Sequence, residues 1–255
     1  MMRAPFAFMM TQQDRPTYLE RMPMTEQLTV ATPDGGFACH VARPTTPGPH
    51  PVVIVLQEIF GVNDGIRSIA ADWAAKGYIA VCPDLFWRIE PGVYLSEAKE
   101  GDWTKAFALY QAYDRDKGVE DIALTINAAR GLQDANGKVG VTGYCLGGLM
   151  TYLSAARTDA DAFAAYYGGG TDGYLEEAEN IGAPLLYHLA EEDEFISKDA
   201  QAKIRAALEG KDKVELYSYP GCNHAFARPG GNHYDDAAAK LAAGRTEAFF
   251  ARTLR

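Results

Sequence analysis

A cysteine flanked by glycines is the first residue of this chain with a clear chemical use. The hexapeptide 143–148 (GYCLGG) follows the apolar run 138–142 and precedes a helix-like run. A sharp strand-to-helix turn strains the backbone of its central residue, and glycines without a Cβ let the neighbouring strand and helix approach it. Cys145 is therefore predicted to be a nucleophile raised above a sheet, with a buried structural cysteine as the alternative.

The residue after this cysteine adds a second function. The amide of Leu146 would lie at a helix N-terminus, where unpaired N–H groups and the helix dipole favour a developing oxyanion. The hexapeptide thus has the form of the nucleophile elbow of the α/β-hydrolase fold, with cysteine at the position where serine is usual. One short segment can supply both the nucleophile and half of an oxyanion hole.

Candidate partners follow in the chain order nucleophile, acid, histidine that this fold uses. The acidic loop 191–194 (EEDE) comes after the apolar run 184–190, and His224 comes after the alternating run 213–219. Each candidate follows a predicted strand, where open parallel sheets build their sites. The residues alone do not choose among the four carboxylates of the loop. The other four histidines fit the position of the base poorly. His40 and His50 precede the elbow, His188 lies within a predicted strand, and His233 precedes the last predicted helix.

Composition narrows the classes of protein. A chain of 255 residues with 47% hydrophobic content can bury a large core as one domain. A net charge of −10 disfavours nucleic acid and anionic membrane surfaces as partners. No apolar run approaches the roughly 20 residues of a membrane span. Four cysteines without C-x-x-C spacing favour a reducing cytoplasm.

A metal site is a weaker alternative for the same residues. Cys222, His224 and His233 lie close together in the sequence, but they lack a second closely spaced ligand pair. We therefore expect neither a metal nor another cofactor. Residues 1–27 are interpreted as an N-terminal arm, and residues 28–255 as a single domain.

Hydrophobic periodicity predicts alternating strands and helices. The predicted strands are 37–42, 52–57, 78–82, 138–142, 162–167, 184–190 and 213–219. The predicted helices are 65–75, 103–132, 146–157, 198–208 and 235–254. This alternation indicates an α/β fold with a mostly parallel central sheet and helices on both faces.

With the elbow, the acidic loop and His224 identified, the chain resembles the dienelactone hydrolases, also called carboxymethylenebutenolidases, from about residue 28 to the C-terminus. The stretches that carry the resemblance are 57–63 (QEIFGVN), 82–86 (CPDLF), 143–148 and 224–228 (HAFAR). The resemblance implies the α/β-hydrolase fold and a triad of Cys145, Asp193 and His224. It selects Asp193 because the family pattern is Asp-x-Phe.

The resemblance also implies roles for charged residues and amides near the triad. Glu58 would contact the cysteine and help to generate a thiolate when substrate arrives, which is chemically sensible because a thiol with a pKa of ~8.5 is mostly protonated at neutral pH. Arg88 and Arg228 would hold a substrate carboxylate. The amides of Ile59 and Leu146 would form the oxyanion hole.

Three apolar or aromatic residues match positions of the family's substrate pocket, namely Phe60, Tyr167 and Phe195. Two residues depart from the family's pattern: Ala225 stands where a hydroxyl residue can occur, and Trp87 is bulkier than the small residue expected there. Because of both departures, the sequence does not predict the shape of the pocket or the exact substrate.

The implied activity is hydrolysis of a small anionic lactone, a dienelactone, to maleylacetate in aromatic catabolism, through an acyl-enzyme on Cys145. The protein would be a monomer or weak homodimer in the cytoplasm. The alternatives are another small-ester, lactone or thioester hydrolase on the same fold, or a non-catalytic sensor that uses Cys145 as a reactive thiol.

Overall fold

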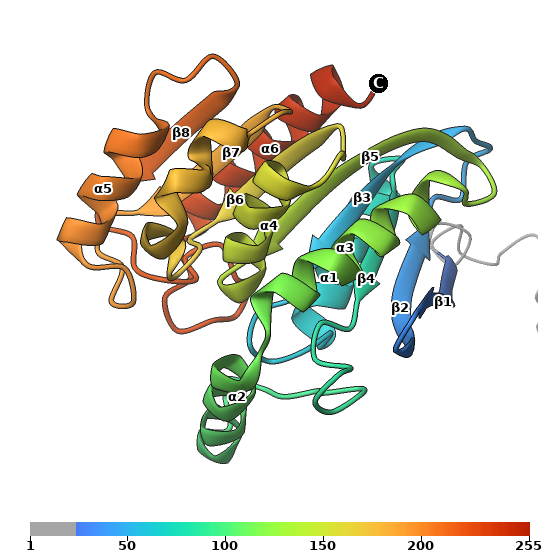
Figure 1. Cartoon of the computed structure of the whole chain (residues 1–255), viewed down its shortest axis with the longest axis horizontal. Helices are drawn as coiled ribbons and strands as arrows, with labels where there is room; N and C mark the ends of the chain where they lie inside the picture. Colours follow the sequence, from blue (N-terminus) through green and yellow to red (C-terminus); the bar gives the residue numbers. More distant parts are fainter. Residues whose placement is uncertain (1–23) are drawn as a thin grey trace, which may run out of the picture.

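The computed structural model describes residues 24–255 and shows a twisted central sheet with helices on both faces (Figure 1). Within these residues, eight strands lie in the order β1-β2-β4-β3-β5-β6-β7-β8. β1 pairs antiparallel with β2, and β2 with β4, whereas every other neighbouring pair is parallel. The predicted mostly parallel α/β architecture is confirmed.

The strands are β1 (Met24–Thr32), β2 (Gly35–Arg43), β3 (His50–Leu56), β4 (Ile79–Pro83), β5 (Ala135–Tyr144), β6 (Ala162–Tyr166), β7 (Leu185–Ala190) and β8 (Val214–Tyr219). The helices are α1 (Asp64–Ala75), α2 (Glu100–Ala112), α3 (Arg115–Arg130), α4 (Leu146–Arg157), the 3₁₀ segment η2 (Thr171–Asn180), α5 (Lys198–Leu208) and α6 (Asp236–Thr253).

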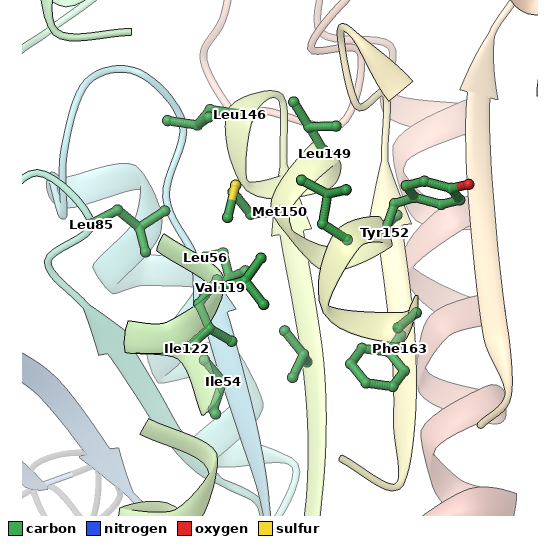
Figure 2. Close-up of a cluster of buried hydrophobic side chains, with 14 of the residues drawn as sticks. Ile54, Leu56, Leu85, Val119, Ile122, Leu146, Leu149, Met150, Tyr152 and Phe163 are labelled. Carbon is green, nitrogen blue, oxygen red and sulfur yellow. The ribbon is translucent and has the colours of Figure 1, made fainter. Parts of the chain in front are cut away.

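The central strands are apolar on both sides because helices cover both faces of the sheet. Along β3, Ile54 and Leu56 face the core under α3, α4 and α5, whereas Val53 and Val55 face the core under α1 and α6. Figure 2 shows the first of these cores, where Ile54 and Leu56 lie beneath side chains of α3 and α4. This double packing fixes the carboxyl ends of the strands, from which the candidate site is built.

The predicted helix 103–132 is two helices, which corrects the sequence analysis. Tyr113 has extended dihedral angles (φ −70°, ψ 120°) and ends α2. The side chain of Asp114 then accepts hydrogen bonds from the amides of Asp116 and Lys117, both at 3.0 Å, and caps α3. Asp114 is a sequence signal for the start of a new helix, but the helical periodicity on both sides of it made the two helices look continuous. As a result α2 stands apart from the sheet (Figure 1).

The N-terminal boundary also differs from the sequence analysis. The predicted arm lies outside the described residues as far as residue 23, but residues 24–27 belong to β1 and pair with β2. Within residues 24–255, no helix has both the length and the apolar character needed to cross a membrane.

Candidate active site

Cys145 occupies the turn between β5 and α4 by itself, since β5 ends at Tyr144 and α4 begins at Leu146. Its backbone angles are φ 56° and ψ −115°, a region that L-residues rarely adopt. A Cβ on Gly143 would come within 2.2 Å of the Gly147 carbonyl oxygen, and one on Gly148 within 2.1 Å of the Tyr166 carbonyl oxygen. The glycines therefore permit the turn, and Cys145 remains partly exposed.

The structure brings His224 and Asp193 together at the carboxyl ends of β8 and β7. The Nδ1 atom of His224 lies 2.9 and 3.0 Å from the two carboxylate oxygens of Asp193, so Nδ1–H donates to this carboxylate. Asp193 Oδ1 also accepts from the amides of Phe195 at 2.9 Å and Ile196 at 3.1 Å. Asp193 and His224 are both buried. Asp193 is thus the acidic-loop residue that contacts the histidine.

Asn223 connects the two loops that carry this pair. Its side-chain oxygen accepts from the amide of His224 at 2.6 Å and from the amide of Glu194 at 3.0 Å. The acid and the histidine are therefore fixed relative to each other by backbone contacts as well as by their own hydrogen bond. The sequence analysis did not single out Asn223.

The ionisation of His224 is coupled to Cys145. Burial lowers the pKa of His224, but the neighbouring Cys145 and the hydrogen-bonded Asp193 together raise it well above its ordinary value of 6.5. Within the described residues, the buried Nε2 atom of His224 has no hydrogen-bond partner. This nitrogen is available to exchange a proton with the thiol and with a substrate.

Backbone strain gathers at this edge of the sheet. Four described residues other than glycine have positive φ, and three of them are Cys145, Tyr167 (37°) and Ala225 (61°). Tyr167 packs edge-on against His224, with ring centroids 5.1 Å apart, and Ala225 follows His224 directly. The strained positions therefore surround the candidate nucleophile and base.

A cavity of about 370 Å³ opens over Cys145. Among the residues predicted for the site, its lining includes Ile59, Phe60, Cys145, Leu146, Phe195, His224 and Arg228. As the first residue of α4, Leu146 has an amide without an intrahelical acceptor, and Ile59 faces the same cavity. The two predicted oxyanion residues thus flank the candidate nucleophile.

Arg228 is bound by two carboxylates. Its Nε and Nη2 atoms lie 2.6 and 3.0 Å from the two carboxylate oxygens of Glu58, and its Nη1 atom contacts Glu97. All three side chains are largely buried. Glu58 therefore pairs with Arg228 in this structure, and the guanidinium charge is more than balanced before any substrate arrives. Glu97 was not identified from the sequence.

Arg88 lies outside the cavity. Its Nε and Nη2 atoms bind both oxygens of Asp121 at 2.9 and 2.8 Å, and its Nη1 atom binds Asp34 at 2.6 Å. The guanidinium carbon also lies 4.4 Å from the ring centroid of Trp87, which donates its own Nε1–H to Asp121. The structure does not bring Arg88 or Trp87 to Cys145, so neither shapes this cavity directly.

The three predicted pocket rings have different positions. Phe60 and Phe195 line the cavity over Cys145. Tyr167 is fully buried and instead lines a neighbouring cavity of about 230 Å³, which shares Phe60 and Arg228 with the first. Tyr167 therefore supports His224 from behind the cavity wall.

Helix α2 supplies side chains that the sequence analysis missed. Trp103, Phe107 and Tyr110, spaced four and three residues apart, line the cavity from one face of α2. Their spacing is visible in the sequence, but such a stripe is usually a core contact. Within residues 24–255, no group of three or more acidic, cysteine or histidine side chains is arranged to hold a metal ion.

Comparison with known proteins places the chain among similar sequences and structures. A model of the dienelactone hydrolase family matches residues 37–254. A relative from Azospirillum brasilense is 44% identical over 91% of this chain and 100% of its own length. The carboxymethylenebutenolidase of Pseudomonas putida is 35% identical over 89% of this chain and 97% of its own. A dienelactone hydrolase relative from Klebsiella pneumoniae, 28% identical, superposes with a TM-score of 0.79 over 90% of this chain and 98% of its own.

Proposed function

The chain belongs to the dienelactone hydrolase family, and we propose that it opens the lactone ring of a dienelactone to maleylacetate through an acyl-enzyme on Cys145. The observation that carries the proposal is the buried pair of His224 and Asp193. Among the described residues, Nε2 of His224 has no hydrogen-bond partner, and the thiol of Cys145 stands on a strained turn at the same site. Carboxymethylenebutenolidase-like hydrolysis needs that combination of nucleophile, base and orienting acid.

In the first half of the reaction, the sulfur of Cys145 bonds to the lactone carbonyl carbon while His224 holds the thiol proton. The carbonyl oxygen becomes an oxyanion, which the amides of Ile59 and Leu146 stabilise. Collapse of this intermediate breaks the ring C–O bond. The leaving group is an enolate, which is a better leaving group than an alkoxide and takes up the proton from His224.

In the second half, a water molecule hydrolyses the thioester. His224 Nε2 accepts a proton from the water as it attacks the acyl carbon, and the proton then returns to the sulfur as the C–S bond breaks. Asp193 keeps the imidazole oriented through Nδ1–H, which leaves Nε2 free for both proton transfers. The residues of the chain suffice for these steps.

Arg228 and Glu58 are proposed to respond to the substrate carboxylate. A carboxylate that binds Arg228 competes with Glu58 and Glu97 for the same guanidinium. Release of Glu58 from Arg228 would free a base that first takes the thiol proton of Cys145 and passes it to His224, which holds it until the enolate leaves. Formation of the thiolate would then depend on the arrival of an anionic substrate.

The first experiment compares cis and trans dienelactones with a neutral nitrophenyl ester, for the wild-type protein and for Cys145→Ala. Cys145-dependent opening of a dienelactone in preference to the ester supports the proposal. Turnover of the ester alone would keep the thiol mechanism but assign the chain to a broader class of ester hydrolases. Thiol modification without turnover of either substrate would identify a reactive-thiol sensor instead.

The position of Arg88 provides a matched control for carboxylate binding. Arg228→Gln should raise KM for the dienelactone by roughly tenfold or more relative to the neutral ester, since a charge-assisted hydrogen bond is lost. Arg88→Gln removes the same charge outside the cavity and should leave that ratio unchanged. If the two variants change the ratio equally, Arg228 does not bind the carboxylate.

A further inference from the structure

Four rings form a continuous line along the cavity wall, and we call them the aromatic arc: Phe60, Trp103, Phe107 and Phe195. Neighbouring ring centroids are 5.0, 5.7 and 6.4 Å apart in that order. The arc begins beside Arg228, whose guanidinium carbon lies 5.4 Å from the Phe60 centroid. It ends beside His224, whose ring centroid is 4.9 Å from that of Phe195. The arc therefore spans the cavity from the candidate carboxylate site to the catalytic base.

Two rings of the arc face solvent to an unusual degree. Phe107 is 39% exposed and Phe195 is 49% exposed, although both border the same cavity. Exposed apolar side chains that adjoin each other on a concave surface mark a binding site more often than isolated ones do. These rings would lose solvent contact if a flat apolar group entered between α2 and Phe195.

Helix α2 contributes little to the core. Only Ala106 and Leu109 of this helix are buried, and its N-cap residue Lys99 makes no side-chain capping hydrogen bond. Its polar contacts with neighbouring segments include a hydrogen bond of 2.8 Å from Trp103 Nε1 to the Glu97 carbonyl oxygen, one of 2.8 Å from the Ser96 amide to Asp102, and an ion pair of 2.6 Å between Lys105 and Glu90. Trp103 and Tyr110 pack against the core from its edge, whereas Phe107 is exposed, so core packing does not explain the position of Phe107.

The distribution of charge around the cavity also favours an apolar ligand group beside α2. The charged side chains in its lining are Asp172, His224 and Arg228. Arg228 is engaged by two carboxylates, and His224 is paired with Asp193. The part of the wall formed by α2 thus offers apolar surface and no cation to a ligand.

We propose that the aromatic arc is a subsite for a flat apolar substituent, such as an aryl group, on the lactone that Cys145 opens. This inference rests on the proposed function and refines its substrate class. A cavity of about 370 Å³ falls in the range of roughly 300–1,000 Å³ that accommodates drug-sized ligands. It has room for a group beyond a bare lactone ring. The substituent lies against Phe107 and Phe195 while the carbonyl carbon meets the sulfur.

The test uses two enol lactones that differ only in one group: α-angelica lactone, which carries a methyl group, and the analogue in which phenyl replaces that methyl. The measured quantity is the ratio of kcat/KM for the phenyl lactone to that for the methyl lactone. Wild-type protein should favour the phenyl lactone. Phe107→Ala should lower the ratio about 3- to 10-fold, the size expected for loss of one aromatic contact, and Phe107→Leu should lower it less.

Tyr234→Ala is the matched control, because Tyr234 is an exposed aromatic residue outside the lining of this cavity. It should leave the ratio unchanged. If Phe107→Ala also leaves the ratio unchanged while Cys145-dependent turnover persists, the subsite is refuted and the proposed function stands. If neither lactone nor a dienelactone is opened in a Cys145-dependent manner, the proposed function itself is wrong. Circular dichroism of each variant excludes misfolding as the cause of a lower ratio.

Discussion

The proposed catalytic residues and the α2 part of the aromatic arc are held in place by different means. Asp193 accepts hydrogen bonds from His224 and from two backbone amides, and Asn223 ties the two loops together. These groups are buried at the ends of packed strands. Phe107, in contrast, belongs to a helix with two buried residues. The residues proposed for the chemistry are thus fixed by the sheet, whereas the part of the proposed subsite formed by Phe107 depends on a peripheral helix.

The largest expected effect comes from removing the nucleophile. Cys145→Ala should reduce kcat for lactone opening by about 10⁴-fold or more, because a triad acts as a unit. Cys222→Ala removes a buried cysteine that does not line the cavity and should keep kcat within about twofold. Stopped-flow absorbance with both variants checks this. Near wild-type activity of Cys145→Ala would show that Cys145 is not the nucleophile.

The next effect concerns the orienting acid. Asp193→Asn keeps the shape of the side chain but weakens its hold on Nδ1–H of His224, so kcat should fall by roughly 10²- to 10⁴-fold with little change in KM. Glu192→Gln, in the same acidic loop but exposed, is the control. Steady-state kinetics would contradict the assignment if Glu192→Gln were the more damaging change.

A third prediction concerns stability on the polar side of the cavity. Arg228→Met leaves the buried carboxylate of Glu58 without its partner, and breaking such a pair should cost about 3 kcal/mol of unfolding free energy. The double variant Arg228→Met/Glu58→Gln should recover much of that loss, because no unpaired charge from this pair remains. Urea unfolding of the single and double variants measures both values. Equal losses would show that side-chain packing, rather than charge, dominates.

The pKa of His224 provides a titration test. Because this pKa is raised above 6.5, protonation of His224 stabilises the folded protein fully below the unfolded pKa, and this stabilisation is lost as pH rises through the folded pKa. Cys145 contributes to the rise, so the pKa of His224 should fall in Cys145→Ala. NMR titration of the imidazole in both proteins measures it. An unchanged value would mean that Asp193 alone offsets the effect of burial.

The smallest effect is expected on the aromatic side. Phe107→Ala should change the unfolding free energy by less than about 0.5 kcal/mol, since the ring is exposed and alanine favours helix. Phe226→Ala, which removes a fully buried ring, should cost about 3–5 kcal/mol. Thermal or urea unfolding compares the two. A large loss for Phe107→Ala would show that Phe107 stabilises the fold and that α2 is held as firmly as the residues at the strand ends.

The sequence predicted what depends on local pattern and missed what depends on contacts between distant segments. The elbow at Cys145 and the alternation of strands and helices follow from glycines and apolar runs that are close in the chain. The choice of Asp193 among four acids needed the family resemblance, because its contact with His224 joins loops about thirty residues apart in the chain. The break at Asp114 was hidden because both flanking segments have helical periodicity.

The partners of charged residues were the hardest feature to predict from the sequence. Arg88 and Arg228 are equivalent cations in the sequence, but Arg88 is directed to Asp121 on α3, whereas Arg228 reaches Glu58 at the end of β3. The partner that each guanidinium meets depends on contacts between segments far apart in the sequence. Glu97 could not be identified for the same reason, because its significance lies entirely in its contact with Arg228.

The strained backbone at Cys145, Tyr167 and Ala225 has a consequence for how this protein can evolve. Conformations of this kind cost of the order of 1–3 kcal/mol each, and here they lie where the nucleophile and base are positioned. Selection for heat resistance would favour any change that relaxes these turns. Selection for turnover would oppose the same changes. Lineages that live at higher temperature would therefore be expected to gain stability far from this edge of the sheet.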